Sequence, residues 1–272
     1  MRLDGELLLV GCGKMGGAML EGWLACGLAP GEVAIVEPNA EIGAGLVRRG
    51  LRHFADAAAL PGSLRPAVVL LAVKPQMMDA AAAAAARFAG PGTLILSIAA
   101  GKTLRYFARR FGERAAVVRA MPNTPAAVGR GITVAVASAE VTPAQRVTAD
   151  ALLGAVGEVA WVEDEALIDP VTALSGGGPA YVFLLIEVLA EAGIAAGLPP
   201  ELAERLARRT VEGAGELARL SQESPATLRK NVISPGGTTL EAVKILTAKD
   251  GLQPLFTRAI AAATRRSREL AD

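Results

Sequence analysis

Continuous apolar runs alternate with helical patterns along the first 160 residues of the chain. The runs occupy residues 6–10, 33–36, 68–73, 94–98 and 116–120, and each is apolar at nearly every position rather than at every second one. Strands of this kind are buried on both faces, as in a parallel sheet that helices cover on both sides. The pattern predicts an α/β domain built on a doubly wound parallel sheet.

The apolar pattern changes after residue 162, because apolar positions then recur at helical spacing. Helices are expected over residues 179–196, 200–220 and 251–270, with glycine and proline between them. We therefore expect two domains, residues 1–162 with the sheet and residues 163–272 that are all helical. The apolar helices are too numerous to be covered by one small bundle, so burial against a second copy of the chain is expected.

Charge and composition limit the classes of binding partner and the cellular location that the protein is expected to have. The 28 Lys and Arg residues balance 27 Asp and Glu residues, so a small-molecule partner is expected rather than nucleic acid or a membrane. Two cysteines and one histidine exclude a disulfide scaffold and a zinc site with four Cys or His ligands. These counts leave open a catalytic zinc site completed by a carboxylate, but no metal is expected. The first ten residues, which include Arg2 and Asp4, lack the apolar run of a signal peptide, and the apolar runs at 68–73 and 182–186 are far shorter than the ~20 residues that span a bilayer. A cytoplasmic protein is expected.

A glycine pattern follows the first predicted strand and opens the first predicted helix. Gly11 permits a tight turn, Gly13 lets a pyrophosphate approach the main chain, and Gly16 allows the helix to pack closely on the strand. Phosphates would then bind at the helix N-terminus, where N–H groups are unpaired. The context predicts a dinucleotide in a Rossmann-type fold.

Glu37 ends the second predicted strand and bears on the choice of dinucleotide. An acidic residue there can accept hydrogen bonds from the adenine ribose 2′-hydroxyl, which favours NADH. Asn39 and Arg48 or Arg49 are close enough in sequence to reach a 2′-phosphate, and Glu37 could also be an ordinary surface charge. The preference between NADPH and NADH stays open.

Two further loops follow predicted strands, at the edge where open α/β sheets bind ligands. Residues 72–76 place Lys74 beside the stiff Pro75, and residues 121–125 hold Asn123 and Thr124 between two prolines. Either loop could instead simply end a buried strand. Both are candidates for contact with the dinucleotide.

In the helical half, two glycine turns precede helices. The turn at residues 175–181 could bind a carboxylate through free N–H groups or be a plain interhelical turn, and the turn at 234–239 could bind a ligand or serve as a threonine N-cap. The only histidine, His53, lies far from these motifs, and a structural role is expected for it. Without a histidine acid, hydride transfer to a protonated C=N bond fits best, because such an electrophile needs orientation more than a strong acid.

Taken together, five ordered motifs resemble those of pyrroline-5-carboxylate reductases. They are GCGKMG at 11–16, AVKPQ at 72–76, MPNTP at 121–125, SGGGPAY at 175–181 and SPGGTT at 234–239. The resemblance covers nearly the whole chain. It implies reduction of 1-pyrroline-5-carboxylate to L-proline with NAD(P)H, the last step of proline biosynthesis, and a homodimer formed through the helical domain that could assemble further into a decamer.

The resemblance also implies roles for individual residues. The cofactor would be bound by Gly11, Gly13, Lys14, Met15, Gly16, Glu37, Asn39, Val73, Lys74, Pro75, Pro122 and Asn123. The substrate would be bound by Ser175, Gly178, Pro179, Gly236, Gly237, Thr238 and Thr239, with contributions from a partner subunit. Thr239 is the expected catalytic residue, as a hydrogen-bond donor near the imine nitrogen.

Two departures from the family pattern affect these expectations. Gly177 replaces a serine that the family usually has, which removes one hydroxyl, and Glu37 replaces a more basic stretch that suits NADPH. Another imine reductase or a β-hydroxyacid reductase on the same two-domain plan is the nearest alternative, and the lysine of that class would be Lys230, Lys244 or Lys249. The other alternative is a binding protein without turnover that senses a nucleotide or handles pyridoxal phosphate.

Overall fold

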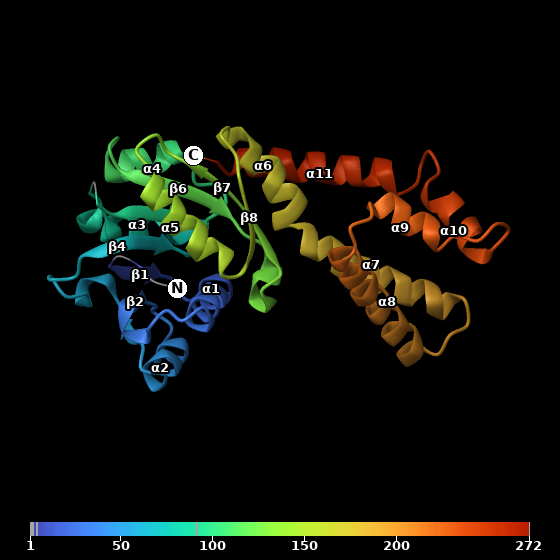
Figure 1. Cartoon of the computed structure of the whole chain (residues 1–272), viewed down its shortest axis with the longest axis horizontal. Coiled ribbons are helices and arrows are strands. Elements are labelled where there is room, and N and C mark those ends of the chain that lie inside the picture. Colours follow the sequence, from blue (N-terminus) through green and yellow to red (C-terminus); the bar gives the residue numbers. More distant parts are fainter. Residues whose placement is uncertain (1–2, 4, 91, 272) are drawn as a thin grey trace. The chain divides into compact units, whose positions relative to one another are not determined.

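The computed structural model describes residues 3, 5–90 and 92–271, so Arg2 and Asp4 lie outside the described residues. The chain forms two compact units (Figure 1). Unit 1 contains Met1–Gly176 and Ala263–Asp272, and unit 2 contains Gly177–Ala262.

Unit 1 is built on one sheet of eight strands in the order β3-β2-β1-β4-β5-β6-β7-β8. The strands are β1 (Glu6–Val10), β2 (Val33–Val36), β3 (Arg52–Phe54), β4 (Pro66–Leu71), β5 (Leu94–Ser97), β6 (Ala116–Met121), β7 (Gly131–Ala137) and β8 (Gly157–Trp161). The first six are parallel, and β7 pairs antiparallel with β6 and parallel with β8. The expectation of a doubly wound sheet is confirmed, with two strands of reversed direction added at one edge.

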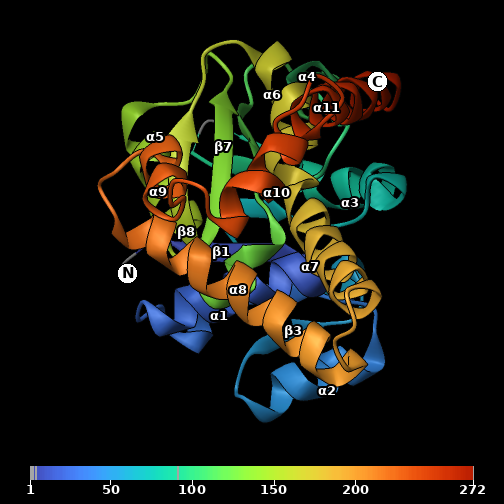
Figure 2. The ribbon, with the colours of Figure 1, turned by 90° about the vertical axis from the view of Figure 1, so that its right-hand side faces the viewer.

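Helices cover both faces of this sheet, as Figure 2 shows. They are α1 (Lys14–Ala25), α2 (Ala40–Arg48), α3 (Met78–Ala85), α4 (Leu104–Phe111), α5 (Pro143–Gly154) and α6 (Ile168–Val171). One apolar core joins the sheet to α1 and α5, where the buried Trp23 donates its indole N–H to the Leu152 carbonyl at 2.8 Å. A second core on the other face contains Met78 of α3 and Phe107 of α4. Burial on both faces is why these strands are apolar throughout.

Unit 1 extends beyond the predicted domain boundary at residue 162. Ile168 of α6 is fully buried against Val134 and Val136 of β7. Ser267, near the end of α11 (Leu252–Glu269), donates its hydroxyl to Asp169 at 2.7 Å. The segments before residue 177 and after residue 262 therefore pack with the sheet.

Unit 2 is helical and leaves a large apolar surface exposed. It contains α7 (Gly178–Ala195), α8 (Pro200–Leu220), α9 (Pro225–Asn231), α10 (Thr238–Leu246) and the first part of α11. The hairpin of α7 and α8 packs through small residues, since Ala190, Ala203 and Ala207 are its buried positions. On α7, the side chains of Val182, Phe183, Leu184, Leu185, Val188 and Leu189 are between 41% and 58% exposed.

The stretch Glu165–Ala195, which includes α7, is long and apolar enough to cross a membrane by length and composition alone. Polar residues and glycines interrupt this stretch, so it is not visible as an uninterrupted apolar run in the sequence. Glu187 and Glu191 interrupt the apolar sequence of α7, and an intramembrane carboxylate is costly. The same exposed side chains suit contact with another protein surface.

Candidate functional site

The turn between β1 and α1 can accept an anion. Gly11 has a φ of +92°, and a side chain at Gly16 would place its Cβ 2.3 Å from the Gly11 carbonyl oxygen. A Cβ at Gly13 would meet no atom within 4 Å. Gly13 is also the N-cap of α1, where no side chain caps the helix and no acidic residue lies in the first turn. The first N–H groups of α1, beginning with Lys14 and Met15, are therefore available to a phosphate.

A cavity of ≈ 390 Å³ lies beside this turn, at the carboxyl ends of β1, β2 and β4. Its wall includes Gly11, Gly13, Glu37, Asp56, Val73 and Lys74. The structure thus brings together five predicted cofactor positions that are up to 63 residues apart, which are Gly11, Gly13, Glu37, Val73 and Lys74. Pro75 follows as the first residue of a 3-10 turn that Lys74 precedes. Asp56 was missed, although it follows the third strand at the same edge.

Glu37 is not the solvated surface charge that the sequence allowed. Its side chain is buried, and its two carboxylate oxygens accept the N–H groups of Cys12 at 2.7 Å and Asn39 at 2.8 Å. Glu37 therefore joins the end of β2 to the glycine turn while it borders the cavity. His53 supports the same strand end, since its Nε2 lies 2.8 Å from the Glu37 carbonyl oxygen.

Arg49 and the amide oxygen of Asn39, which are near Glu37 in sequence, have partners within the protein. The guanidinium group of Arg49 binds both carboxylate oxygens of Glu21 at 2.5 and 2.8 Å. The Asn39 side chain caps α2 by accepting the N–H groups of Glu41 and Ile42. Among the groups considered for a 2′-phosphate, the Arg49 guanidinium and the amide oxygen of Asn39 are thus engaged within the protein.

Cys12 lies inside the glycine turn and does not supply a nucleophile. Burial, followed by the charge of Glu37, raises the pKa of its thiol to about 11. A thiol with such a pKa stays protonated near neutral pH, and the protonated form is unreactive. Cys12 therefore contributes packing beneath the turn.

The loop after β6 meets the segment that precedes α7. The Asn123 side chain is buried, and its amide nitrogen donates to the Ser175 carbonyl oxygen at 3.3 Å. A Cβ at Gly176 would lie 2.6 Å from the Cε of Met121. The hydroxyl of Ser175 donates to the Val171 carbonyl at 3.1 Å. Pro122 lies between Met121 and Asn123, so two motifs that are 50 residues apart in sequence are adjacent in unit 1.

Buried Arg119, also missed from the sequence, stabilises the same region. Its Nη1 donates to Glu165 at 2.8 Å, and the same carboxylate oxygen accepts the N–H of Leu104 at the start of α4. This ion pair links β6 to the segments before α4 and α6. Sequence signals for it are absent, because the three residues are up to 61 positions apart.

The remaining predicted substrate residues lie in unit 2. Gly178 and Pro179 are the first residues of α7, with Gly177 as the N-cap. Gly236 has a φ of +70°, and Gly237 is the N-cap of α10 with no capping side chain. Thr238 and Thr239 are therefore in the first turn of α10 and not at the cap. The alternative that a threonine merely caps this helix is wrong, and the first N–H groups of α10 are open to an anion.

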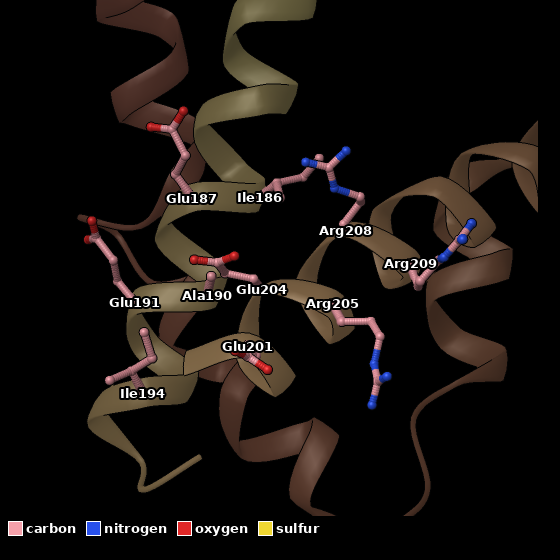
Figure 3. Close-up of a pocket in the computed structure, with 10 residues that line it drawn as sticks. All are labelled: Ile186, Glu187, Ala190, Glu191, Ile194, Glu201, Glu204, Arg205, Arg208 and Arg209. Atoms are coloured by element: carbon pink, nitrogen blue, oxygen red, sulfur yellow. The ribbon is translucent and has the colours of Figure 1, made fainter. Parts of the chain in front are cut away.

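A larger cavity of ≈ 610 Å³ lies in unit 2 between α7 and α8 (Figure 3). It is lined by charged side chains, with Glu187 and Glu191 on α7 and Arg205, Arg208 and Arg209 on α8. Figure 3 shows these glutamates on one side and Arg205 and Arg209 on the other. No residue of the five motifs lines this cavity, so it does not alter the assignment of the site.

Comparisons with known proteins give matches along the whole chain. The family model for pyrroline-5-carboxylate reductase dimerisation matches residues 165–270, and a model described as NADP oxidoreductase coenzyme F420-dependent matches residues 6–101. A pyrroline-5-carboxylate reductase of Pseudomonas aeruginosa is 40% identical and covers 98% of this chain and 97% of its own. One of Synechocystis is 42% identical, with 97% and 98% covered.

Solved structures agree with these relatives. The structure of a pyrroline-5-carboxylate reductase from Coxiella burnetii has a TM-score of 0.91 at 34% identity, and 99% of this chain and 100% of that chain are covered. A pyrroline carboxylate reductase of Plasmodium falciparum, solved with NADP bound, has a TM-score of 0.83 at 26% identity, with 99% of each chain covered.

Proposed function

The chain belongs to the pyrroline-5-carboxylate reductase family, and we propose that its own residues carry out that reaction as set out below. The reaction is the reduction of the C=N bond of 1-pyrroline-5-carboxylate to L-proline with NAD(P)H, the last step of proline biosynthesis. The observation that carries the proposal is the glycine turn, where the open space at Gly13 meets the uncapped N-terminus of α1.

The residues present fit a pyridine dinucleotide. The N–H groups of Gly13, Lys14, Met15 and Gly16 would bind the pyrophosphate at the positive end of α1. Glu37, Val73 and Lys74, which line the cavity, would border the adenosine and the riboses together with Asn39 and Pro75. Pro122 and the main chain of Asn123 would line the nicotinamide. The bound dinucleotide supplies a hydride.

Residues of the helical segment would bind and orient the substrate. The substrate carboxylate would bind Gly236, Gly237 and Thr238, because the first N–H groups of α10 lack a capping side chain. The Thr239 hydroxyl would donate a hydrogen bond to the imine nitrogen, which holds the C=N carbon in place for reduction. Ser175, Gly178 and Pro179 would contribute to the wall of the substrate site, with residues of a partner subunit.

We propose that residues 1–162 bind the dinucleotide and that residues 163–272 serve substrate binding and dimerisation, although both ends of the second segment pack in unit 1. Assembly through the helical segment follows from the family match, and a homodimer that could form a decamer is the finer proposal. A cytoplasmic location and the absence of a metal, of nucleic acid and of a membrane partner belong to the same proposal.

The activity test is an initial rate with pyrroline-5-carboxylate and either NADH or NADPH near neutral pH. We expect oxidation of the nucleotide that depends on the substrate. If neither nucleotide is oxidised, the proposed function is rejected.

Replacing Glu37 by Ser tests its part in choosing the nucleotide. The carboxylate borders the cavity and repels a 2′-phosphate, so its removal should raise kcat/KM for NADPH relative to NADH by on the order of tenfold. Glu41→Ser is the matched control, because Glu41 is an exposed carboxylate at the start of α2. An unchanged ratio in Glu37→Ser would remove Glu37 from nucleotide selection.

The homodimer has a direct test on α7. Phe183 is 58% exposed, and we expect it to be buried against a second copy. Phe183→Asp should therefore shift the mass in sedimentation from a multiple of two chains to one chain. A wild-type mass of one chain would contradict the dimer.

A further inference from the structure

The main-chain carbonyl of Ser175 cannot be paired in the usual way for a helix. Residues Thr172–Gly176 form a π-helical segment that leads to α7. The residue four positions after Ser175 is Pro179, which has no N–H group. The N–H five positions on, that of Ala180, donates to the Gly177 carbonyl at 3.0 Å. The donor that an α-helical carbonyl would use is therefore missing, and the donor that a π-helical carbonyl would use is already engaged.

Asn123 supplies a donor to this carbonyl from a distant loop. Its Nδ2 donates to the Ser175 oxygen at 3.3 Å, and its Oδ1 accepts the Ile132 N–H of β7 at 3.0 Å. The orientation of the amide follows from its partners, because a main-chain N–H can only donate and a carbonyl can only accept. One side chain therefore uses both ends of its amide within unit 1.

The contact with Ile132 continues the sheet beyond its last pair. Met121 lies opposite Val134 in the antiparallel pairing of β6 and β7, and the same register places residue 123 opposite residue 132. The Asn123 side chain thus takes the place of a main-chain acceptor where the strands separate. This contact fixes the amide on the sheet, which gives the bond to Ser175 a rigid base.

We propose that Asn123 is a positioning residue that acts through Ser175, by holding the π-helical turn Thr172–Gly176 against the loop after β6. The proposal rests on the proposed function, and it assigns to the Asn123 amide a task other than direct contact with the nicotinamide. The turn that it holds leads into Gly178 and Pro179, which are proposed substrate residues. Loss of the bond should therefore affect substrate turnover more than nucleotide binding.

Hydrogen exchange tests the structural part without any activity measurement. We expect Asn123→Ala to speed amide exchange in the peptide that spans residues 170–182, on the order of tenfold, because the unpaired Ser175 carbonyl favours opening. Thr93→Val is the matched control, because it too removes a side-chain hydrogen bond to a main-chain carbonyl. The Thr93 hydroxyl donates to the Pro66 carbonyl at 2.9 Å. Equal exchange in the two variants would overturn the proposal.

A double-mutant cycle tests whether the effect of Asn123 depends on the missing N–H group of Pro179. Asn123→Asp keeps an acceptor for Ile132 but cannot donate to Ser175, and we expect kcat/KM for the substrate to fall on the order of tenfold. Pro179→Ala restores an N–H four residues after Ser175. In that background the loss caused by Asn123→Asp should shrink to about threefold or less. An equal loss in both backgrounds would overturn the proposal.

Measuring the nucleotide dissociation constant distinguishes a positioning role of the Asn123 side chain from its direct contact with the nucleotide. We expect Asn123→Asp to change it by less than about threefold, measured by calorimetry without substrate. A loss of nucleotide affinity as large as the loss of kcat/KM would overturn the proposal in favour of direct binding. If the wild type binds nucleotide but reduces no substrate, the proposed function fails, whereas the exchange experiment still decides the role of Asn123.

Discussion

Replacement of Thr239 by Val is expected to lower kcat on the order of 10²-fold, with little change in nucleotide affinity. Thr239 is half-buried in the first turn of α10, where its hydroxyl would hydrogen-bond to the imine nitrogen. Val keeps the size and the branched shape, so the substitution removes the hydroxyl while the helix is retained. A positioned donor of this kind contributes typically 10²–10⁴-fold in rate. Steady-state kinetics with saturating nucleotide would measure the loss.

Thr247→Val is the matched control for this experiment. Thr247 follows α10, and its hydroxyl donates to the Val243 carbonyl at 2.7 Å. Thr247→Val thus removes a threonine hydroxyl in the same unit as Thr239→Val, but outside the proposed site. A wild-type kcat in Thr239→Val, or an equal loss in Thr247→Val, would contradict the role of Thr239.

The positions of the glycine turns were predictable because they depend on local sequence. Gly11 requires a positive φ and Gly16 a close approach to the Gly11 carbonyl, and both needs are visible in the spacing of the glycines. Strands buried on both faces were recognised for a similar reason. A strand buried on both faces is apolar along its whole length, whichever strands it pairs with.

The strands that the sequence analysis missed lie at the two edges of the sheet or next to an edge. The outer strand β3 has only three residues, all of them half-buried, and its charged and aromatic side chains give no apolar run. The other outer strand, β8, begins at Gly157 and includes Glu158. These two outer strands are stabilised by their neighbours rather than by burial of every side chain, so hydrophobicity alone does not mark them. In contrast, β7 is apolar and mostly buried, so its sequence did carry a signal that was missed.

The parts of the site that could not be predicted depend on long-range contacts. Glu37 is buried because the N–H groups of Cys12 and Asn39 compensate its charge, and Cys12 is 25 residues away. Asn123 meets Ser175 across 52 residues. The sequence showed that Glu37 and Asn123 carry polar groups at candidate positions. The residues with which they form hydrogen bonds follow only from the fold.

Gly13 and Gly16 should respond to alanine in opposite ways, although both belong to the same turn. Gly13 has an extended main chain with a φ of −70°, and a Cβ there would meet no protein atom within 4 Å. Gly13→Ala should therefore keep the melting temperature within about 2 °C of wild type, since no packing is disturbed. Its methyl group would occupy the space of the pyrophosphate, and the nucleotide dissociation constant should rise on the order of 10²-fold.

Gly16→Ala should instead destabilise the protein. Its Cβ would lie 2.3 Å from the Gly11 carbonyl oxygen, a main-chain atom that cannot move without distorting the turn. Overpacking of this kind costs roughly 1–3 kcal/mol or more, so the melting temperature should fall by about 3–10 °C.

Gly17→Ala is the control for both variants. Its Cβ would make ordinary contact at 3.6 Å with the Cys12 carbonyl oxygen, and alanine favours the helix by up to about 1 kcal/mol. We therefore expect wild-type nucleotide affinity and equal or higher stability. Calorimetry of nucleotide binding and thermal unfolding would be measured on all three variants. If Gly13→Ala bound nucleotide as the wild type does, the pyrophosphate would not approach the main chain at Gly13, and the glycine turn could not be the cofactor site proposed for this chain.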